Sequence, residues 1–161
     1  MGRFFEPSRK NTGVESIRTY PALAGQAIVF GSLVLLDANG LLTLGGADPA
    51  SILGTALNPQ GRTPGFDVGH SPVLINGLPQ ADLVSVALAS TTEFMGQMTN
   101  AGAIVTPTQA MVADTFGVVN TAGVWTIDQT ETVNTRLTIT DVDIDNRWFF
   151  FRFLAANIQA A

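Results

Sequence analysis

Short runs of strand-forming apolar residues, separated by turn sequences, follow one another from residue 25 onward. Within 83–88, Ser85 and Ala87 alternate with Val84 and Val86, which is the period of two expected of a strand with two different faces. No segment of ten or more residues has the apolar period of 3.6 that an amphipathic helix requires. We therefore predict strands at 27–30, 33–36, 41–44, 52–57, 73–75, 83–88, 116–119, 124–127, 135–140 and 148–154.

The turns between these runs indicate how the strands are joined. Asn39-Gly40 and Asn76-Gly77 each follow one apolar run and precede another, and both residue types tolerate the positive φ of a tight hairpin turn. The polar segment 120–123 separates a third pair of runs. We predict three hairpins, which join 33–36 to 41–44, 73–75 to 83–88 and 116–119 to 124–127.

The C-terminal third has the clearest strand patterns. After Asp141 the apolar positions change phase, which predicts a β-bulge or bend at that residue. The segment 148–154 is aromatic on both faces, so it is expected to be covered on both sides, as a deep core strand or partly as an oligomer contact. Residues 92–115 are less regular, because Gly96, Gly102 and Pro107 favour short strands over a helix.

Residues 1–24 differ from the rest of the chain. They combine charged residues with Pro7, Pro21 and the turn sequence 11–13, and they show no sustained apolar period. We predict an extended N-terminal arm over 1–24 and a single β-rich domain over 25–161. The fold class is all-β, with eight to eleven short strands in a compact β-barrel or β-sandwich, a jelly-roll arrangement included.

Composition and charge narrow the functional classes. The chain is 46% hydrophobic and 13% charged, which excludes disorder, and it has no cysteine for a disulfide or a thiolate metal site. The net charge of −5 argues against a nucleic-acid partner, although residues 1–20 hold four basic against two acidic side chains. The uncharged run 19–36 contains Pro21 and two glycines, so no membrane span is expected, and the N-terminus does not resemble a secretory signal.

Candidate catalytic chemistry is sparse. A nucleophilic triad would need His70, the single histidine, which lies in a Gly- and Pro-rich loop, and a Ser–Lys dyad would need Lys10 in the arm. No phosphate-binding glycine motif and no cofactor motif is present. The sequence therefore predicts a protein that is not an enzyme and has no cofactor.

One acidic cluster leaves an alternative open. Asp141, Asp143 and Asp145 share a strand face if the strand is regular, where they are solvated, paired with Arg136 or Arg147, or bound to a cation. A calcium loop needs Gly at its sixth position and Glu at its twelfth, and this sequence has neither. The spacing alone does not decide whether a cation binds.

The segment 19–57 carries a family resemblance. It contains an extended entry at 20–22, a strand and turn ending in Asp37-Ala38-Asn39-Gly40, then Ala47-Asp48 and the pattern Ile52-Leu53-Gly54-Thr55-Ala56. This succession resembles the small capsid cement, or head decoration, proteins of tailed bacteriophages. The resemblance covers about a quarter of the chain, and the remainder shares only its β-rich, charge-poor character.

The resemblance implies a structural virion protein, made in the host cytoplasm, that binds the outside of an assembled capsid. It would stabilise the shell by bridging neighbouring subunits of the major capsid protein, and it would self-associate as a trimer or dimer. The basic, aromatic-bearing arm is expected to bind the capsid, and its removal (residues 1–20) is expected to leave the body folded. The arm residues assigned to this contact are Arg3, Phe4, Phe5, Arg9, Lys10, Arg18 and Tyr20.

A carbohydrate- or receptor-binding β-module is the alternative function. Such modules present exposed aromatic side chains on loops, whereas Trp125 and Trp148 both lie within predicted strands. The positions of these two tryptophans favour the capsid-binding interpretation.

Overall fold

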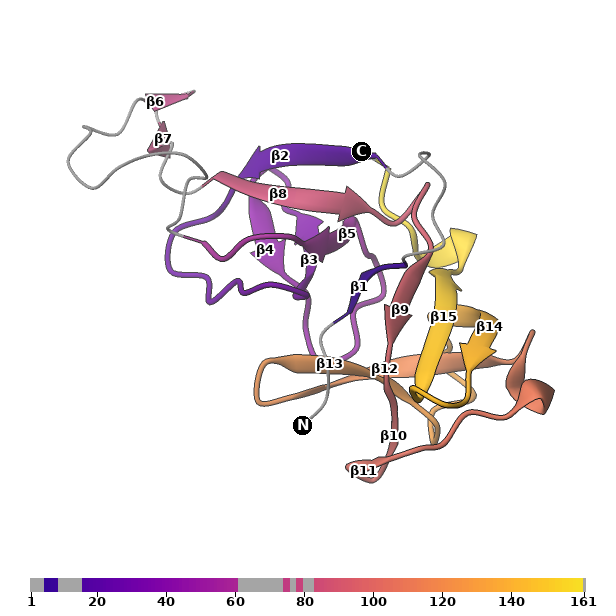
Figure 1. The fold of residues 1–161 in the computed structure, drawn as a ribbon. Coiled ribbons are helices and arrows are strands. Elements are labelled where there is room, and N and C mark those ends of the chain that lie inside the picture. The colour runs from indigo at the N-terminus through magenta and orange to yellow at the C-terminus, as the bar shows by residue number, and fades with distance from the viewer. Residues whose placement is uncertain (1–4, 9–15, 61–73, 76–77, 80–82, 161) are drawn as a thin grey trace.

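The computed structural model describes residues 5–8, 16–60, 74–75, 78–79 and 83–160. Their regular secondary structure is almost entirely β, with 46% of residues in strands, arranged in two main sheets that are not closed into a barrel (Figure 1). The predicted all-β class is confirmed. Of the two predicted arrangements, a barrel and a sandwich, the two-sheet structure agrees with the sandwich.

The smaller main sheet is antiparallel and has five strands. Its strand order is β2 (Ile17–Pro21), β8 (Leu83–Leu88), β5 (Gly54–Ala56), β3 (Leu33–Leu36) and β4 (Leu42–Leu44). The alternation predicted for β8 holds over its first four residues, because Val84 and Val86 are fully buried while Ser85 is half-buried, but it ends at Ala87, which is fully buried as well. These valines belong to a hydrophobic cluster with Val34, Leu42 and Leu53.

The larger sheet has eight strands. Its order is β1 (Glu6–Pro7), β9 (Phe94–Gly96), β15 (Trp148–Phe153), β14 (Leu137–Asp143), β12 (Thr115–Thr121), β13 (Val124–Asp128), β10 (Met98–Asn100) and β11 (Ala103–Ile104). Only Gln97 separates β9 from β10, yet β9 pairs with β15 while β10 pairs in parallel with β13. The sheet therefore bends round on itself at Gln97.

Four small elements complete the described chain. The strands β6 (Leu74–Ile75) and β7 (Leu78–Pro79) pair only with each other. Two short 3-10 helices, η2 (Gln109–Met111) and η3 (Ala155–Asn157), follow β11 and β15.

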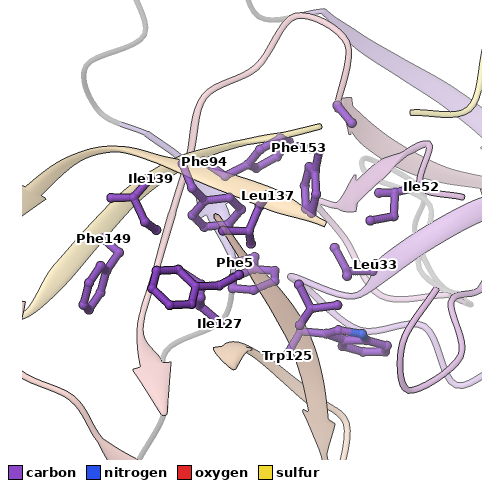
Figure 2. Close-up of a cluster of buried hydrophobic side chains, with 14 of the residues drawn as sticks. Phe5, Leu33, Ile52, Phe94, Trp125, Ile127, Leu137, Ile139, Phe149 and Phe153 are labelled. Carbon is purple, nitrogen blue, oxygen red and sulfur yellow. The ribbon is translucent and has the colours of Figure 1, made fainter. Parts of the chain in front are cut away.

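The main core is rich in aromatic side chains and takes residues from both sheets (Figure 2). Leu33 and Ile52 come from the side of the five-stranded sheet, whereas Trp125 and Ile127 come from β13. The rings of Phe5, Phe94, Phe149, Phe151 and Phe153 also lie in this cluster. The Phe5 and Phe151 rings meet edge to face, with their centroids 4.9 Å apart.

The two predictions for the C-terminal third are confirmed. Strand β15 is buried on both faces, since Phe149 and Phe151 point into the main core while Trp148 and Phe150 form a separate buried cluster with Met95. The pairing of β14 with β15 shifts register between Ile139 and Asp141, which is the predicted bulge.

Two of the three predicted hairpins are confirmed. β3 and β4 form one, and Asp37 closes its turn because Oδ1 accepts from the N–H groups of Asn39 and Leu41. β12 and β13 form the other, through a two-residue turn at Ala122 and Gly123, both with positive φ.

The third predicted hairpin was wrong. Leu74–Ile75 pairs with Leu78–Pro79 rather than with β8, and β8 lies between β2 and β5. The prediction of a strand at 27–30 was also wrong. These residues are outside the strands of the structure, and of the four only Ile28 is buried. Residues 92–115 form three short strands and one 3-10 turn, as their glycines and proline indicated, and such short strands raise the number in the described residues above the predicted eleven.

The described parts of the predicted arm are built into the two sheets. β1 pairs with β9, β2 pairs with β8 along its whole length, and the Phe5 ring is completely buried. The deletion of residues 1–20 would remove an edge strand from each sheet and a core ring, so we now expect it to destabilise the body rather than leave it folded. Pro7 and Pro21 had favoured an arm outside the sheets. Both lie in edge strands, where proline is tolerated.

Candidate partner-binding surface

The seven predicted contact residues do not form one surface in the structure. Phe5 lies in the main core and cannot contact a partner without unfolding, so its assignment to the capsid contact was wrong. Arg18 and Tyr20 both lie on β2, and Arg18 is exposed. The other four, Arg3, Phe4, Arg9 and Lys10, lie outside the described residues, as does His70.

Tyr20 has a mainly structural position. Its side chain is half-buried and packs against the Val34–Leu42–Val84 cluster of the five-stranded sheet. The buried phenolic oxygen has no hydrogen-bond partner among the residues that the structure describes. Tyr20 therefore anchors β2 to the core and leaves Arg18 as the exposed member of the predicted set.

β2 is an edge strand, and its hydrogen-bonding groups can be assigned from its register. The Leu88 N–H donates to the Ser16 carbonyl at 2.9 Å, and Arg18 pairs with Val86 two residues further on. Backbone groups point alternately to the two sides of an antiparallel strand, so the N–H and C=O groups of Arg18 and Tyr20 point toward β8. The N–H and C=O groups of Ile17 and Thr19 therefore point away from the sheet.

The neighbouring strand supports this assignment. Ser85, which lies opposite Thr19, donates its N–H to Asn58 Oδ1 at 2.7 Å on the side away from β2. Thr19 and Ser85 thus form a pair with no backbone hydrogen bond between them, linked only through their hydroxyl oxygens at 3.3 Å.

The open part of the edge is short and exposed. The Ile17 side chain is 55% exposed, and Arg18 and Thr19 are exposed as well. Beyond Pro21 the same side of the chain is occupied, because the Leu23 N–H donates to the Leu42 carbonyl at 2.9 Å. The free groups are therefore confined to Ile17 and Thr19, with the exposed Arg18 between them and no described carboxylate paired with it.

The acidic cluster of β14 has local structural roles. Asp141 Oδ1 accepts from the Val142 N–H, and both carboxylate oxygens of Asp143 accept from Asn146 in the turn before β15. Among the residues that the structure describes, no three His, Asp or Glu side chains gather into a metal site. Arg136, a predicted partner of this cluster, instead pairs with Asp48.

A shallow depression of about 470 Å³ lies beside these acidic residues. It is lined by Val142, Asp143, Ile144, Asp145 and Phe150. The Ile144 side chain at its rim is 50% exposed, so the end of the β14–β15 hairpin presents an apolar group next to two carboxylates.

A second projecting feature was not anticipated from the sequence. Val133, in the loop between β13 and β14, is 86% exposed. Glu131 holds this loop, because its Oε1 accepts from the N–H groups of Val133 and Asn134 at 3.0 and 2.8 Å. Both hydrogen bonds lower the pKa of Glu131 from its ordinary value, and the bond from the Asn134 N–H has the larger effect.

Both tryptophans are inaccessible. Trp125 is 1% exposed in the main core and Trp148 is 5% exposed in the cluster with Met95 and Phe150. Neither indole can stack against a sugar in this conformation. Among the large apolar side chains exposed on the described surface, Phe30 is aromatic and the others are aliphatic.

The comparisons with known proteins identify no family for this chain. No helix within the described ranges is long and apolar enough to cross a membrane. No family model matches the sequence, and no curated protein is significantly similar to it.

Proposed function

We propose that this chain is a structural virion protein that binds the outer surface of an assembled phage capsid and bridges neighbouring major capsid subunits. The observation that carries the proposal is the resemblance of 19–57 to capsid cement proteins. In the structure this segment supplies β3, β4, β5 and the end of β2, which are three complete strands and part of a fourth in the five-stranded sheet.

The Gly54 motif within that segment has a clear structural reason. A Cβ at Gly54 would overlap the Ala87 carbonyl oxygen of β8, and Ala56 is fully buried two residues later. The pattern of small residues at 54 and 56 therefore permits close approach of β5 and β8.

The described surface suits an assembly role. Its exposed large apolar side chains are distributed over several loops and edges rather than gathered in one cleft, and they include Ile17, Ile104, Val133 and Ile144. Low charge reduces the desolvation cost of covering such a surface with neighbouring subunits. For the carbohydrate-binding alternative, both tryptophans are buried, and the exposed aromatic ring of the described surface is that of Phe30, at 37%.

Co-sedimentation with purified capsids tests the proposal. The probe is a head assembled from the major capsid protein encoded by the same genome and lacking this chain. The protein is expected to pellet with heads to saturation, and to remain in the supernatant when centrifuged alone. A supernatant fraction unchanged by saturating heads would exclude capsid binding.

A further inference from the structure

We infer that the open edge of β2 binds an extended segment of the major capsid protein as an additional antiparallel strand. An acidic side chain of that segment would lie opposite Arg18. The inference rests on the proposed function, because it names the part of this chain that the capsid subunit contacts.

The backbone of β2 presents the groups that strand addition requires. Ile17 and Thr19 are two residues apart, so their N–H and C=O groups match the spacing of successive hydrogen-bonded pairs on an antiparallel partner. Four backbone hydrogen bonds can form without any change in the pairing between β2 and β8. The exposed side chains of this edge leave it open to another chain.

A second copy of this chain fits the same edge poorly. A two-fold pairing centred on Arg18 satisfies Ile17 and Thr19 but places two Arg18 guanidinium groups directly opposite each other. A pairing centred on Thr19 places Ile17 opposite Pro21, which has no N–H and whose neighbours already bond β4. In these two registers, self-pairing meets either charge repulsion or missing hydrogen bonds.

Charge complementarity selects the occupant. Because Arg18 bonds β8, the residue opposite it on an added strand occupies a non-hydrogen-bonded pair, in which side chains approach most closely. A carboxylate at that position can accept directly from the exposed guanidinium. The described edge offers no second charge, so this one contact sets the preferred register.

Substitution of Thr19 separates the backbone contribution from the side chain. Thr19→Pro removes the outward N–H and the hydroxyl contact with Ser85 while sparing every backbone hydrogen bond to β8, and Arg18 before it already has the extended conformation that a following proline favours. We expect Thr19→Pro to weaken head binding at least about tenfold. Thr19→Val keeps the N–H and should bind within about twofold of the original protein.

Reversal of the Arg18 charge tests the acidic partner. Arg18→Glu should weaken head binding at least about tenfold, whereas Arg152→Glu, at an exposed arginine of β15, should stay within about twofold. Equal binding of Thr19→Pro and the original protein would overturn the inference and leave the proposed function intact. Failure of the original protein to bind heads would overturn both.

Hydrogen exchange provides a readout that does not depend on folding of the proline variant. In the original protein, the Ile17 and Thr19 amides should exchange fast when free and at least about tenfold more slowly on heads. Unchanged exchange at both amides in saturated heads would contradict strand addition. A dimer of the isolated protein that Thr19→Pro abolishes would identify a second copy as the occupant and would also overturn the inference.

Discussion

Arg136 and Asp48 form a bidentate ion pair, in which Nε donates to Oδ1 at 3.0 Å and Nη2 donates to Oδ2 at 3.1 Å. Asp48 lies in the loop between β4 and β5, and Arg136 directly precedes β14, so the pair joins the two sheets. The C-terminal segment makes a second connection of this kind, because the Gln159 side-chain amide forms hydrogen bonds with both the N–H and the C=O of Leu36. Polar contacts thus supplement the shared core.

The ion pair should make a small, salt-sensitive contribution to stability. Its side chains are 15% and 40% exposed, so solvent screens the attraction. In a double-mutant cycle with Arg136→Met and Asp48→Asn, we expect a coupling of about 0.5–1 kcal/mol in urea unfolding. A coupling that did not decrease in 1 M salt would contradict an electrostatic origin.

Close packing of β5 against β8 should make Gly54 irreplaceable. A Cβ there would meet the Ala87 carbonyl group and lie 2.9 Å from a Val86 methyl carbon, and neither strand can move without disturbing its neighbours. Gly54→Ala should lower the free energy of unfolding by about 3 kcal/mol. Gly46→Ala, where a Cβ meets nothing within 4 Å, should change it by less than about 0.5 kcal/mol.

The first described residue should contribute strongly to the core. Phe5 is fully buried against Phe151, and Phe5→Ala would leave a cavity among aromatic rings. We expect a loss of about 3–5 kcal/mol in chemical unfolding, against less than about 0.5 kcal/mol for the exposed Val133→Ala. If the two substitutions had equal effects, the placement of residues 5–8 in the eight-stranded sheet would be wrong.

Acid sensitivity should depend in part on Glu131. Its pKa is lowered in the folded state by the Asn134 and Val133 N–H groups, so its stabilising effect is present above the ordinary value of 4.5 and is lost as the pH falls through the folded value. Glu131→Gln should therefore lower Tm above about pH 6, and the difference should shrink below about pH 4. Asp145→Asn, in the exposed turn before β15, controls for loss of one charge. A Tm difference independent of pH would exclude this mechanism.

Local sequence patterns were sufficient for part of the fold. The turn at Asp37–Leu41 and the phase change at Asp141 depend on residues close together in the chain, and both are confirmed, as is the alternation over the first four residues of β8. The pairing of Glu6 with Met95 depends on residues 89 positions apart, in strands of two and three residues, and no local period reports it.

The candidate surface was predictable only in part. The sequence singled out Arg18 as a basic residue near aromatic ones, but the value of its position comes from the unpaired groups of Ile17 and Thr19. Edge status is a property of the whole sheet order, so it cannot be obtained from one segment. Exposure of Val133 likewise depends on how Glu131 holds its loop.

Calorimetry of heads tests the central claim most directly, because it measures both binding and reinforcement of the shell. Heads lacking this protein are titrated with it, and the temperature of shell disruption is followed. A ligand that binds only the intact shell raises that temperature as its sites fill. We predict a saturable rise that Arg18→Glu reduces and Arg152→Glu does not, whereas a disruption temperature unchanged at saturating protein would contradict a capsid-stabilising role.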